Sequence, residues 1–350
     1  MPVFESTAFD EHERVVFCHD RESGLRAIIA IHSTALGPAA GGCRMWRYAN
    51  DDLAIVDALR LSKGMSYKNG MADLPFGGGK AVIIGDPVRD KTQALLESFG
   101  RFVDKLGGDY VTAEDVGMSV ADMETISSQT RFVSGRSQHG GAAGGDPSPK
   151  TAYGVFLGIK AAAAFRLGSD NLEGVRVAVQ GLGNVGRHLC HLLHDAGAAL
   201  FVADIHDERT RQVCETLGAT AVPVDQILFH EVDVIAPCAL GGIFDANSIP
   251  RLNASIIAGG ANNQLASDED GDRLRERNIL YAPDYVINAG GIINVAYEYF
   301  GKGDDDIVNE RIEKIGPRLA AIFERARDQH RSTNSVANEL ARERISHGAS

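Results

Sequence analysis

Three polar residues in the first third of the chain have the types and spacing of a proton-transfer site. Lys68 and Lys80 are twelve residues apart, and Asp115 follows a strand-like run. One lysine ammonium can hold a small carboxylate. A second lysine nearby in an apolar site has its charged form disfavoured by desolvation and by the like charge, so it can act as a base near neutral pH. An aspartate at a strand end can relay the proton, although each residue taken alone is usually a solvated surface charge.

The glycines before Lys80 raise a different possibility. Residues 77–80 read GGGK, which resembles the end of a phosphate-binding loop of the form G-x-x-x-x-G-K-[ST]. That motif needs glycine at position 74 and serine or threonine at position 81, where this chain has Leu74 and Ala81. We therefore reject a phosphate loop and expect the glycines to let backbone come close to something that Lys80 also touches.

A second glycine pattern, within residues 177–204, predicts a dinucleotide site. Gly181, Gly183 and Gly186 form G-x-G-x-x-G between a predicted strand and a predicted helix, and Asp204 ends the next strand. The three glycines permit a tight turn, close approach to a pyrophosphate and close helix–strand packing, and the helix N-terminus receives the phosphates. Asp204 would accept hydrogen bonds from the adenosine ribose and repel a 2′-phosphate, which favours NAD over NADP.

The residues between these motifs predict the elements that position them. Alternating runs around a turn at 21–24 predict a β-hairpin, and helical spacing over 51–71 predicts a helix capped by Asp51 or Asp52. After residue 150, short β-branched runs alternate with helices, which predicts a parallel sheet covered on both faces. Amphipathic helices are expected from about 304 to 346, broken near Pro317.

We predict an α/β protein of two domains. Residues 1–138 form an N-terminal α/β substrate-binding and catalytic domain, and a glycine-rich hinge at 139–150 leads to a C-terminal Rossmann NAD-binding domain with a parallel sheet at 151–324. Helices at about 325–350 are expected to rejoin the first domain.

Composition excludes several classes of function. The formal net charge of −12 opposes a general affinity for nucleic acid or anionic membranes, and no apolar run approaches the length of a spanning helix. The five cysteines form no C-x-x-C pair, and the N-terminus does not resemble a signal peptide, so we expect reduced thiols in the cytoplasm. His188, His191 and His194 lack the pattern of a zinc motif, so we expect no metal.

Several separated motifs together resemble one enzyme family. Between about 40 and 300 the chain contains, in order, GPAAGGCRM, KGMSYKNGM, LPFGGGKAVIIGDP, YVTAEDVGMS, DPSPKTAYGV, VAVQGLGNVG, APCALGG, AGGANNQ and YAPDYVINAGGIINVA. This set is similar to the glutamate/leucine/phenylalanine/valine dehydrogenases, with the leucine dehydrogenase branch the nearest. The resemblance implies reversible NAD-dependent conversion of an L-amino acid to a 2-oxo acid and ammonia, by a homo-oligomer.

The resemblance also implies residue roles. Lys68 would bind the substrate carboxylate, Lys80 would take the amino proton or activate water, Asp115 would shuttle protons, and the backbone at Gly41 and Gly42 would approach the substrate. The residues implied to hold the cofactor are Thr151, Gly181, Gly183, Asn184, Val185, Gly186, Asp204, Ile205, Ala236, Cys238, Asn262 and Asn288.

The implied side-chain pocket is apolar and consists of Ala40, Met65, Ala113, Ile292 and Val295. The glutamate branch has lysine and serine at positions 40 and 295, so glutamate should be rejected. The leucine enzymes have leucine where this chain has Ala40, which enlarges the pocket. We expect leucine and other branched-chain amino acids, with phenylalanine as the alternative. A non-catalytic NAD-binding regulatory protein is the alternative of another class, and the intact Lys68, Lys80 and Asp115 set argues against it.

Overall fold

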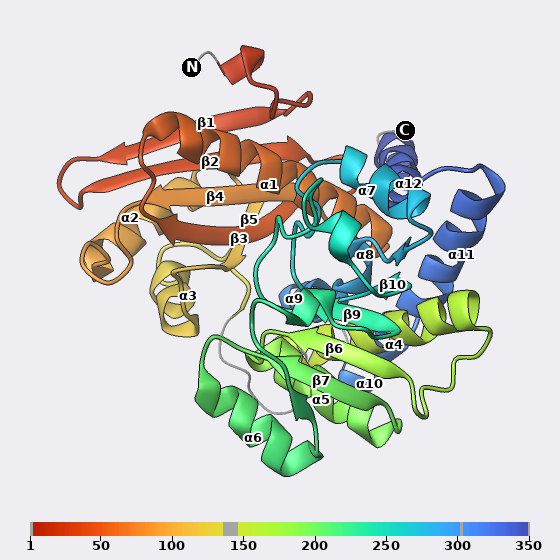
Figure 1. Ribbon diagram of the computed structural model, residues 1–350. Coiled ribbons are helices and arrows are strands. Elements are labelled where there is room, and N and C mark those ends of the chain that lie inside the picture. The colour runs from red at the N-terminus through yellow and green to blue at the C-terminus, as the bar shows by residue number, and fades with distance from the viewer. Residues whose placement is uncertain (1–2, 136–145, 302–303, 349–350) are drawn as a thin grey trace. The chain divides into compact units, whose positions relative to one another are not determined.

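The computed structural model describes residues 3–135, 146–301 and 304–348, and the chain divides into two compact units (Figure 1). The first unit contains residues 1–146, 294–305 and 341–350, and the second contains 147–293 and 306–340. This division differs from the expected boundaries, because 294–305 belong to the first unit and 325–340 to the second. Of the expected hinge, residues 139–145 lie outside the described part of the chain, and 148–150 already belong to helix α4 (Ser148–Leu167).

The first unit is built on a mixed five-stranded sheet with the order β1-β2-β4-β3-β5. Its strands are β1 (Arg14–Asp20), β2 (Leu25–Ser33), β3 (Ala39–Trp46), β4 (Gly77–Ile84) and β5 (Tyr110–Glu114). β1 and β2 form the predicted hairpin, β2 and β4 are antiparallel, and β3 is parallel to both β4 and β5. β3 was not predicted, because two central glycines weaken the strand pattern.

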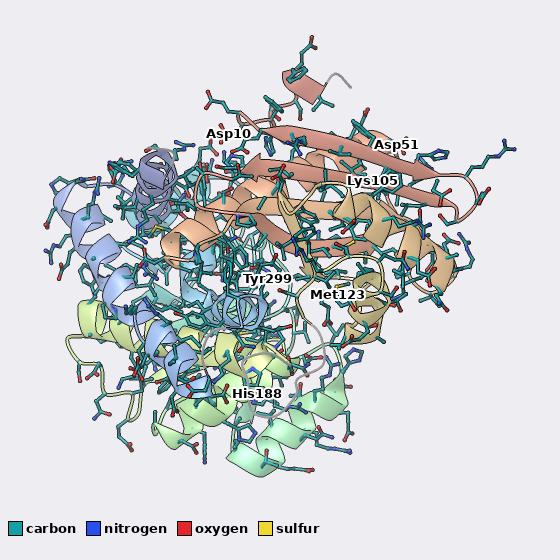
Figure 2. The ribbon with its side chains drawn as sticks, turned by 180° about the vertical axis from the view of Figure 1, so that it is seen from behind. Asp10, Asp51, Lys105, Met123, His188 and Tyr299 are labelled. Atoms are coloured by element: carbon teal, nitrogen blue, oxygen red, sulfur yellow. The ribbon has the colours of Figure 1, made fainter. Side chains whose placement is uncertain are left out.

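Helices cover both faces of this sheet. Helix α1 (Asp51–Met71) packs on the face formed by Ile28, Ala30 and Val82, while α2 (Gln93–Asp104) and α3 (Val120–Ser127) cover the opposite face. Figure 2 labels Asp51 at the start of α1 and Met123 on α3. The expected cap of α1 was wrong: Asn50 accepts the Leu53 amide at 3.0 Å, and Asp51 and Asp52 occupy the first turn, where their charge suits the helix dipole.

Two segments from late in the sequence complete the first unit. Helix α9 (Gly290–Tyr299) crosses the boundary between the units, and within the first unit Phe76 packs on Tyr299 and Phe300, with ring centroids 5.6 and 4.9 Å away. The end of α12 (Thr333–Gly348) is joined to α1 by a 2.7 Å hydrogen bond from Arg342 Nε to the Tyr67 hydroxyl. These long-range contacts explain why the boundary does not follow the sequence order.

The second unit contains a parallel six-stranded sheet with the order β11-β10-β9-β6-β7-β8. Its strands are β6 (Arg176–Gln180), β7 (Ala199–Ala203), β8 (Thr220–Ala221), β9 (Val234–Pro237), β10 (Ile256–Ile257) and β11 (Leu280–Tyr281). Besides α4, its helices include α5 (Asn184–Asp195), α6 (Asp207–Leu217), α7 (Glu269–Glu276), α8 (Asp284–Ile287), α10 (Asp305–Ile312) and α11 (Ile315–Asp328). The strand order reverses at β6, so the carboxyl ends of β6 and β9 form a topological switch point, the usual ligand position in such sheets. None of the described helices is long and apolar enough to cross a membrane.

The three glycines before Lys80 are part of β4, not of a loop that opens a helix. A Cβ on Gly78 would lie 2.1 Å from the Ser66 amide nitrogen of α1, and a Cβ on Gly79 would lie 2.7 Å from the Tyr110 ring. A Cβ on Gly41 of β3 would lie 1.8 Å from the Gly79 carbonyl oxygen. Rejection of a phosphate loop is therefore confirmed, and the glycines allow α1, β3 and β4 to pack at close range.

We predict that Gly78→Ala lowers the free energy of unfolding by about 3 kcal/mol or more, because the new methyl meets backbone atoms that have no room to move. Gly64→Ala, on the open face of α1, is the matched control and should raise stability by up to about 1 kcal/mol through helix propensity. Urea unfolding of both variants measures the difference, and equal stabilities would contradict the packing explanation.

Candidate active site

Two of the predicted catalytic residues form a close ion pair. Lys80 lies in the middle of β4, is only 5% exposed, and its Nζ is 2.9 Å from Oδ2 of Asp115, which follows β5 directly. The sheet order explains the contact, since β3 alone separates β4 from β5. The sequence predicted a second ammonium near Lys80; the close contact that the structure shows is with the Asp115 carboxylate.

A third charged residue, Arg44, belongs to the same cluster and was missed from the sequence. Its Nε donates to the same Asp115 Oδ2 at 2.9 Å, and its Nη1 donates to Asp57 Oδ2 at 2.9 Å. The Tyr48 hydroxyl also donates to that Asp57 oxygen, at 2.6 Å. The available signal was an arginine between two apolar residues, Cys43 and Met45, because a guanidinium within an apolar run needs a partner.

The two cations control the ionisation of Asp115. Burial alone would raise the pKa of this carboxyl, but the Lys80 ammonium and the Arg44 guanidinium outweigh burial and lower the pKa below its ordinary value. Asp115 is therefore an anion that accepts two charge-assisted hydrogen bonds on one oxygen. Arg44 is in turn held by Asp57, which the exposed Arg60 also approaches at 3.4 Å.

Lys68 lies in the last turn of α1, beside the residues that join this helix to β4. Asn69 Nδ2 donates to the Gly77 carbonyl at 2.6 Å, and Ser66 is the residue that a side chain at Gly78 would meet. The Ser66 hydroxyl also contacts His32 Nδ1 at 2.7 Å. These contacts fix the end of α1 against the strand that carries Lys80.

The predicted substrate-side residues of the first unit gather around Gly41. Ala40 is buried and pairs with Gly78 and Val111 in the register of β3, and Gly42 pairs with Ala113. The Gly41 carbonyl accepts the Tyr110 hydroxyl at 2.7 Å, and the Met65 side chain lies 3.2 Å from the position of a Gly41 Cβ. Gly42 has no room for a side chain either, since a Cβ there would lie 2.7 Å from Asp115 Cβ.

The remaining two residues of the predicted pocket lie on α9. Ile292 and Val295 are three residues apart, so they share one face of the helix. Ile292 belongs to the second unit and Val295 to the first.

Gly181, Gly183 and Gly186, the fingerprint glycines, have a geometry that fits a dinucleotide. Gly181 has φ +91°, which favours glycine, and a Cβ on Gly186 would lie 1.9 Å from the Gly181 carbonyl oxygen. Gly183 caps α5 and faces open space, next to a cavity of about 140 Å³ lined partly by Asn184, Arg187 and Arg209. Free amides at the start of a twelve-residue helix, with room beside Gly183, fit a pyrophosphate group.

The predicted residues near β9 meet the fingerprint at the switch point. The Cys238 amide donates to the Gln180 carbonyl at 2.7 Å, and a Cβ on Gly181 would lie 3.0 Å from the Cys238 carbonyl carbon. Ala236 is buried in β9, and Val185 Cγ1 lies 3.0 Å from the position of a Gly260 Cβ. These predicted cofactor residues therefore lie close together.

Asn262, Asn288 and Thr151 are further predicted cofactor residues, and all three lie in the second unit. Asn288 Nδ2 donates to Asn262 Oδ1 at 2.7 Å, and Asn288 Oδ1 is buried with no hydrogen-bond partner among the described residues. Thr151 donates its hydroxyl to the Pro147 carbonyl at 3.0 Å in the first turn of α4, and its Oγ1 lies 2.6 Å from the position of a Gly291 Cβ. An unsatisfied buried amide oxygen is an acceptor available to a carboxamide N–H.

Asp204 lies just after β7 and binds the fingerprint loop itself. Its Oδ2 accepts the Leu182 amide at 2.7 Å, and its Oδ1 accepts the His206 amide at 2.9 Å. Burial would raise the pKa of Asp204, but these two amides outweigh it and the pKa is lowered. Arg209 Nη1 lies 3.6 Å from Oδ1, so a cation shares this position, and the next residue, Ile205, is largely exposed.

Within the described ranges, no three His, Cys, Asp or Glu side chains are grouped so that they could hold a metal ion.

Both parts of the chain match one protein family. Residues 12–132 match the Glu/Leu/Phe/Val dehydrogenase dimerisation domain, and residues 140–207 and 199–348 match the Glutamate/Leucine/Phenylalanine/Valine dehydrogenase domain. The chain belongs to this family. It is an amino acid dehydrogenase of the Glu/Leu/Phe/Val type, as the motifs indicated.

Relatives of this dehydrogenase act on different amino acids. Leucine dehydrogenase of Bacillus cereus is 51% identical over 345 residues, covering 99% of this chain and 94% of that protein. Valine dehydrogenase of Streptomyces virginiae is 49% identical over 339 residues, covering 96% and 94%. The crystal structure of L-tryptophan dehydrogenase from Nostoc punctiforme has a TM-score of 0.85 and 47% identity, with 97% of each chain covered.

We predict that Arg44→Gln destabilises this dehydrogenase by about 2 to 3 kcal/mol at pH 7, somewhat less than for a fully buried pair because the Arg44 side chain is 23% exposed. Asp115 has a lowered folded pKa, so its contribution to stability is present above its unfolded pKa and is lost as the pH falls through the folded pKa. Loss of Arg44 raises the pKa of Asp115 in the folded state. The difference in free energy of unfolding between Arg44→Gln and wild type should therefore shrink as the pH falls from the folded pKa of Asp115 in the variant to its folded pKa in the wild type.

Urea unfolding from pH 7 to pH 3 measures this deficit. Arg60→Gln is the control, since Arg60 is exposed and contacts Asp57 but not Asp115. A deficit in Arg44→Gln that stays constant over the whole pH range would refute the coupling to Asp115.

Proposed function

We propose that the chain catalyses the reversible, NAD-dependent oxidative deamination of an apolar L-amino acid, with leucine and other branched-chain amino acids favoured. The amino acid, NAD⁺ and water give the 2-oxo acid, an ammonium ion, NADH and a proton. The observation that supports this reaction best is the buried Lys80–Asp115 pair, anchored by Arg44, since proton transfer needs groups held within hydrogen-bond distance.

The proposed chemistry assigns a role to each charged group. Lys68 holds the substrate α-carboxylate, which leaves the amino group to Lys80. With its amine deprotonated, Lys80 Nζ accepts a proton from the substrate ammonium, which makes loss of hydride from Cα possible. NAD, when bound, supplies the hydride acceptor.

Hydrolysis of the resulting imine requires further proton transfers. Lys80 first passes the proton taken from the substrate ammonium through Asp115 to solvent. It then takes a proton from the attacking water and returns it to the nitrogen of the carbinolamine, and the carbinolamine hydroxyl loses its proton as the carbonyl forms and ammonia leaves. Asp115 relays protons through its existing 2.9 Å contact with Lys80. Because Lys80 must be deprotonated before it can act as a base, deamination should be faster at alkaline pH.

The preference for NAD is proposed from the charge at the end of β7. The Asp204 carboxylate would repel a 2′-phosphate, and each of its oxygens has a second lone pair for a ribose hydroxyl. Arg209, 3.6 Å from Asp204, acts in the opposite direction by attracting phosphate. Initial rates with NAD and NADP at equal concentration measure the balance, and faster turnover with NADP would reverse the proposal.

An aromatic substrate is the second candidate. Ala40 supports it, because a small side chain leaves more room than the leucine implied for leucine enzymes, and a tryptophan dehydrogenase is 48% identical to this chain. The apolar character of Ala40, Met65, Ala113, Ile292 and Val295 suits both aliphatic and aromatic side chains. A difference of one methylene in such a pocket discriminates by only about 10- to 200-fold.

We also infer a homo-oligomer, supported by the match of residues 12–132 to a dimerisation domain. A solution mass equal to one chain, measured by light scattering, would contradict this inference. The cytoplasm remains the expected compartment.

A substrate panel tests the proposed function. Wild-type protein with NAD⁺ and L-leucine, L-isoleucine, L-valine, L-phenylalanine or L-tryptophan at alkaline pH should form NADH, fastest with an aliphatic substrate. Lys80→Ala should reduce kcat/KM by about 10³-fold while NADH binding is retained, since general base catalysis contributes about 10²- to 10⁴-fold. Lys105→Ala, an exposed lysine after α2 (Figure 2), is the control and should keep wild-type activity.

Wild-type protein that binds NADH but is inactive with every apolar amino acid would favour a non-catalytic NAD-binding protein. Near-normal turnover in Lys80→Ala would instead show that another group is the base.

Paired substitutions at Ala40 test the substrate assignment. Ala40→Leu should raise the ratio of kcat/KM for leucine over tryptophan by about tenfold, because the added side chain fills pocket space, and Ala40→Gly should change the ratio in the opposite direction. A folding defect would lower both activities together and leave the ratio unchanged. An unchanged ratio in both variants, with activity intact, would remove Ala40 from the pocket.

A further inference from the structure

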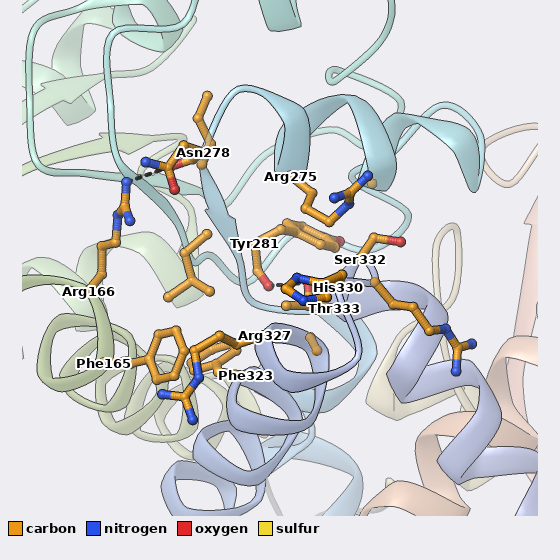
Figure 3. A pocket seen from close by; sticks show the side chains of 15 residues that line it. Phe165, Arg166, Arg275, Asn278, Tyr281, Phe323, Arg327, His330, Ser332 and Thr333 are labelled. Atoms are coloured by element: carbon orange, nitrogen blue, oxygen red, sulfur yellow. Dashed lines mark hydrogen bonds between the residues drawn. The ribbon is translucent and has the colours of Figure 1, made fainter.

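The second unit has a cavity of about 450 Å³ that the proposed reaction does not use. It lies among the end of α4, the end of α7, strand β11 and the turn between α11 and α12. Figure 3 shows Arg275, Tyr281, His330 and Ser332 on one side of it, and Phe165, Phe323 and Arg327 on another. Its volume falls in the range of small-molecule sites.

The charge of the cavity wall is unusual for this acidic chain. Fifteen described residues line the cavity, and they include no Asp or Glu but one histidine and four arginines: His330, Arg166, Arg275, Arg327 and Arg331. A concave surface that carries four guanidiniums and no acidic side chain concentrates positive potential. This contrasts with the whole chain, whose formal net charge is −12.

The four arginines are held in place by different partners. Arg166 donates to the Asn278 carbonyl at 2.7 Å, a contact that leaves its charge intact. Among the described residues the ion-pair partner of Arg275 is Asp272, at 4.0 Å, and Arg327 is paired with its exposed neighbour Asp328. Arg331 is paired with Glu339 and also donates to Gln329 Oε1 and to Ser335 Oγ.

A buried hydroxyl adds a second, independent indication. Ser332 lines the cavity, is 2% exposed, and its Oγ has no hydrogen-bond partner among the described residues. The neighbouring Thr333 hydroxyl, by contrast, donates to the Tyr281 carbonyl at 2.6 Å. A buried hydroxyl without a partner costs free energy unless a ligand satisfies it.

We propose that this cavity binds the phosphate group of a small anionic molecule. Planar guanidiniums donate paired hydrogen bonds to phosphate oxygens, and the Ser332 hydroxyl supplies a further donor. The apolar wall supports this geometry, since Phe165 and Phe323 pack with ring centroids 5.5 Å apart and the Arg327 guanidinium lies 5.6 Å from the Phe165 ring. This binding is separate from the amino acid reaction proposed above.

Calorimetric titration of the full chain with inorganic phosphate, at ionic strength held constant with chloride, tests the proposal. Wild type should show saturable binding with a Kd of about 1 mM. Arg275→Gln combined with Arg327→Gln should weaken binding at least about tenfold, through loss of charge-assisted hydrogen bonds. Arg211→Gln combined with Arg251→Gln changes the charge of the same unit equally, outside the cavity, and should leave the Kd unchanged.

Two further variants complete the experiment. Ser332→Ala removes only the buried hydroxyl, should fold normally, and should weaken phosphate binding by about threefold. Arg187→Gln tests whether phosphate binds instead at the start of α5, next to the fingerprint glycines. The proposal is overturned by equal affinity in wild type and the Arg275/Arg327 variant, by loss of binding in Arg187→Gln alone, or by no saturation up to about 20 mM phosphate.

Discussion

One carboxylate oxygen, Oδ2 of Asp115, receives both the ammonium of Lys80 and the guanidinium of Arg44. Removing these charges from water is costly, and their attraction compensates only if every partner is held in place. The adjacent strands β4, β3 and β5 supply the three groups, and Asp57 on α1 supplies the second negative charge. The sheet order of the first unit is therefore what makes the charged cluster possible.

Close backbone packing is the second requirement. Gly41, Gly42, Gly78 and Gly79 each lie where a Cβ would overlap a neighbouring strand, helix or ring. Without side chains at these positions, β3 and β4 approach each other, and the start of the Asp115 loop reaches Gly42. The glycine-rich motifs thus serve the charged cluster by bringing the strands together.

Sequence patterns predicted the elements whose signals are local. The β1–β2 hairpin, helix α1 and the fingerprint turn each follow from residues within about thirty positions, since periodicity and turn chemistry act at short range. The patterns failed at β3, where two glycines hide a strand, and at the domain boundary, which depends on Phe76 meeting Tyr299 across more than two hundred residues. Arg44 was missed for a related reason, because its partners Asp57 and Asp115 come from other elements.

The two proposed phosphate sites of the second unit illustrate the same difference. At the start of α5, backbone amides and glycines are the recognition elements, so a short motif is enough to reveal the site. The arginine-lined cavity uses side chains from positions 166, 275, 327 and 331, which no motif connects. The arginines form a recognisable cluster only in the folded chain. The clearest feature of this cavity is the buried Ser332 hydroxyl, and burial of a single serine cannot be read from the sequence.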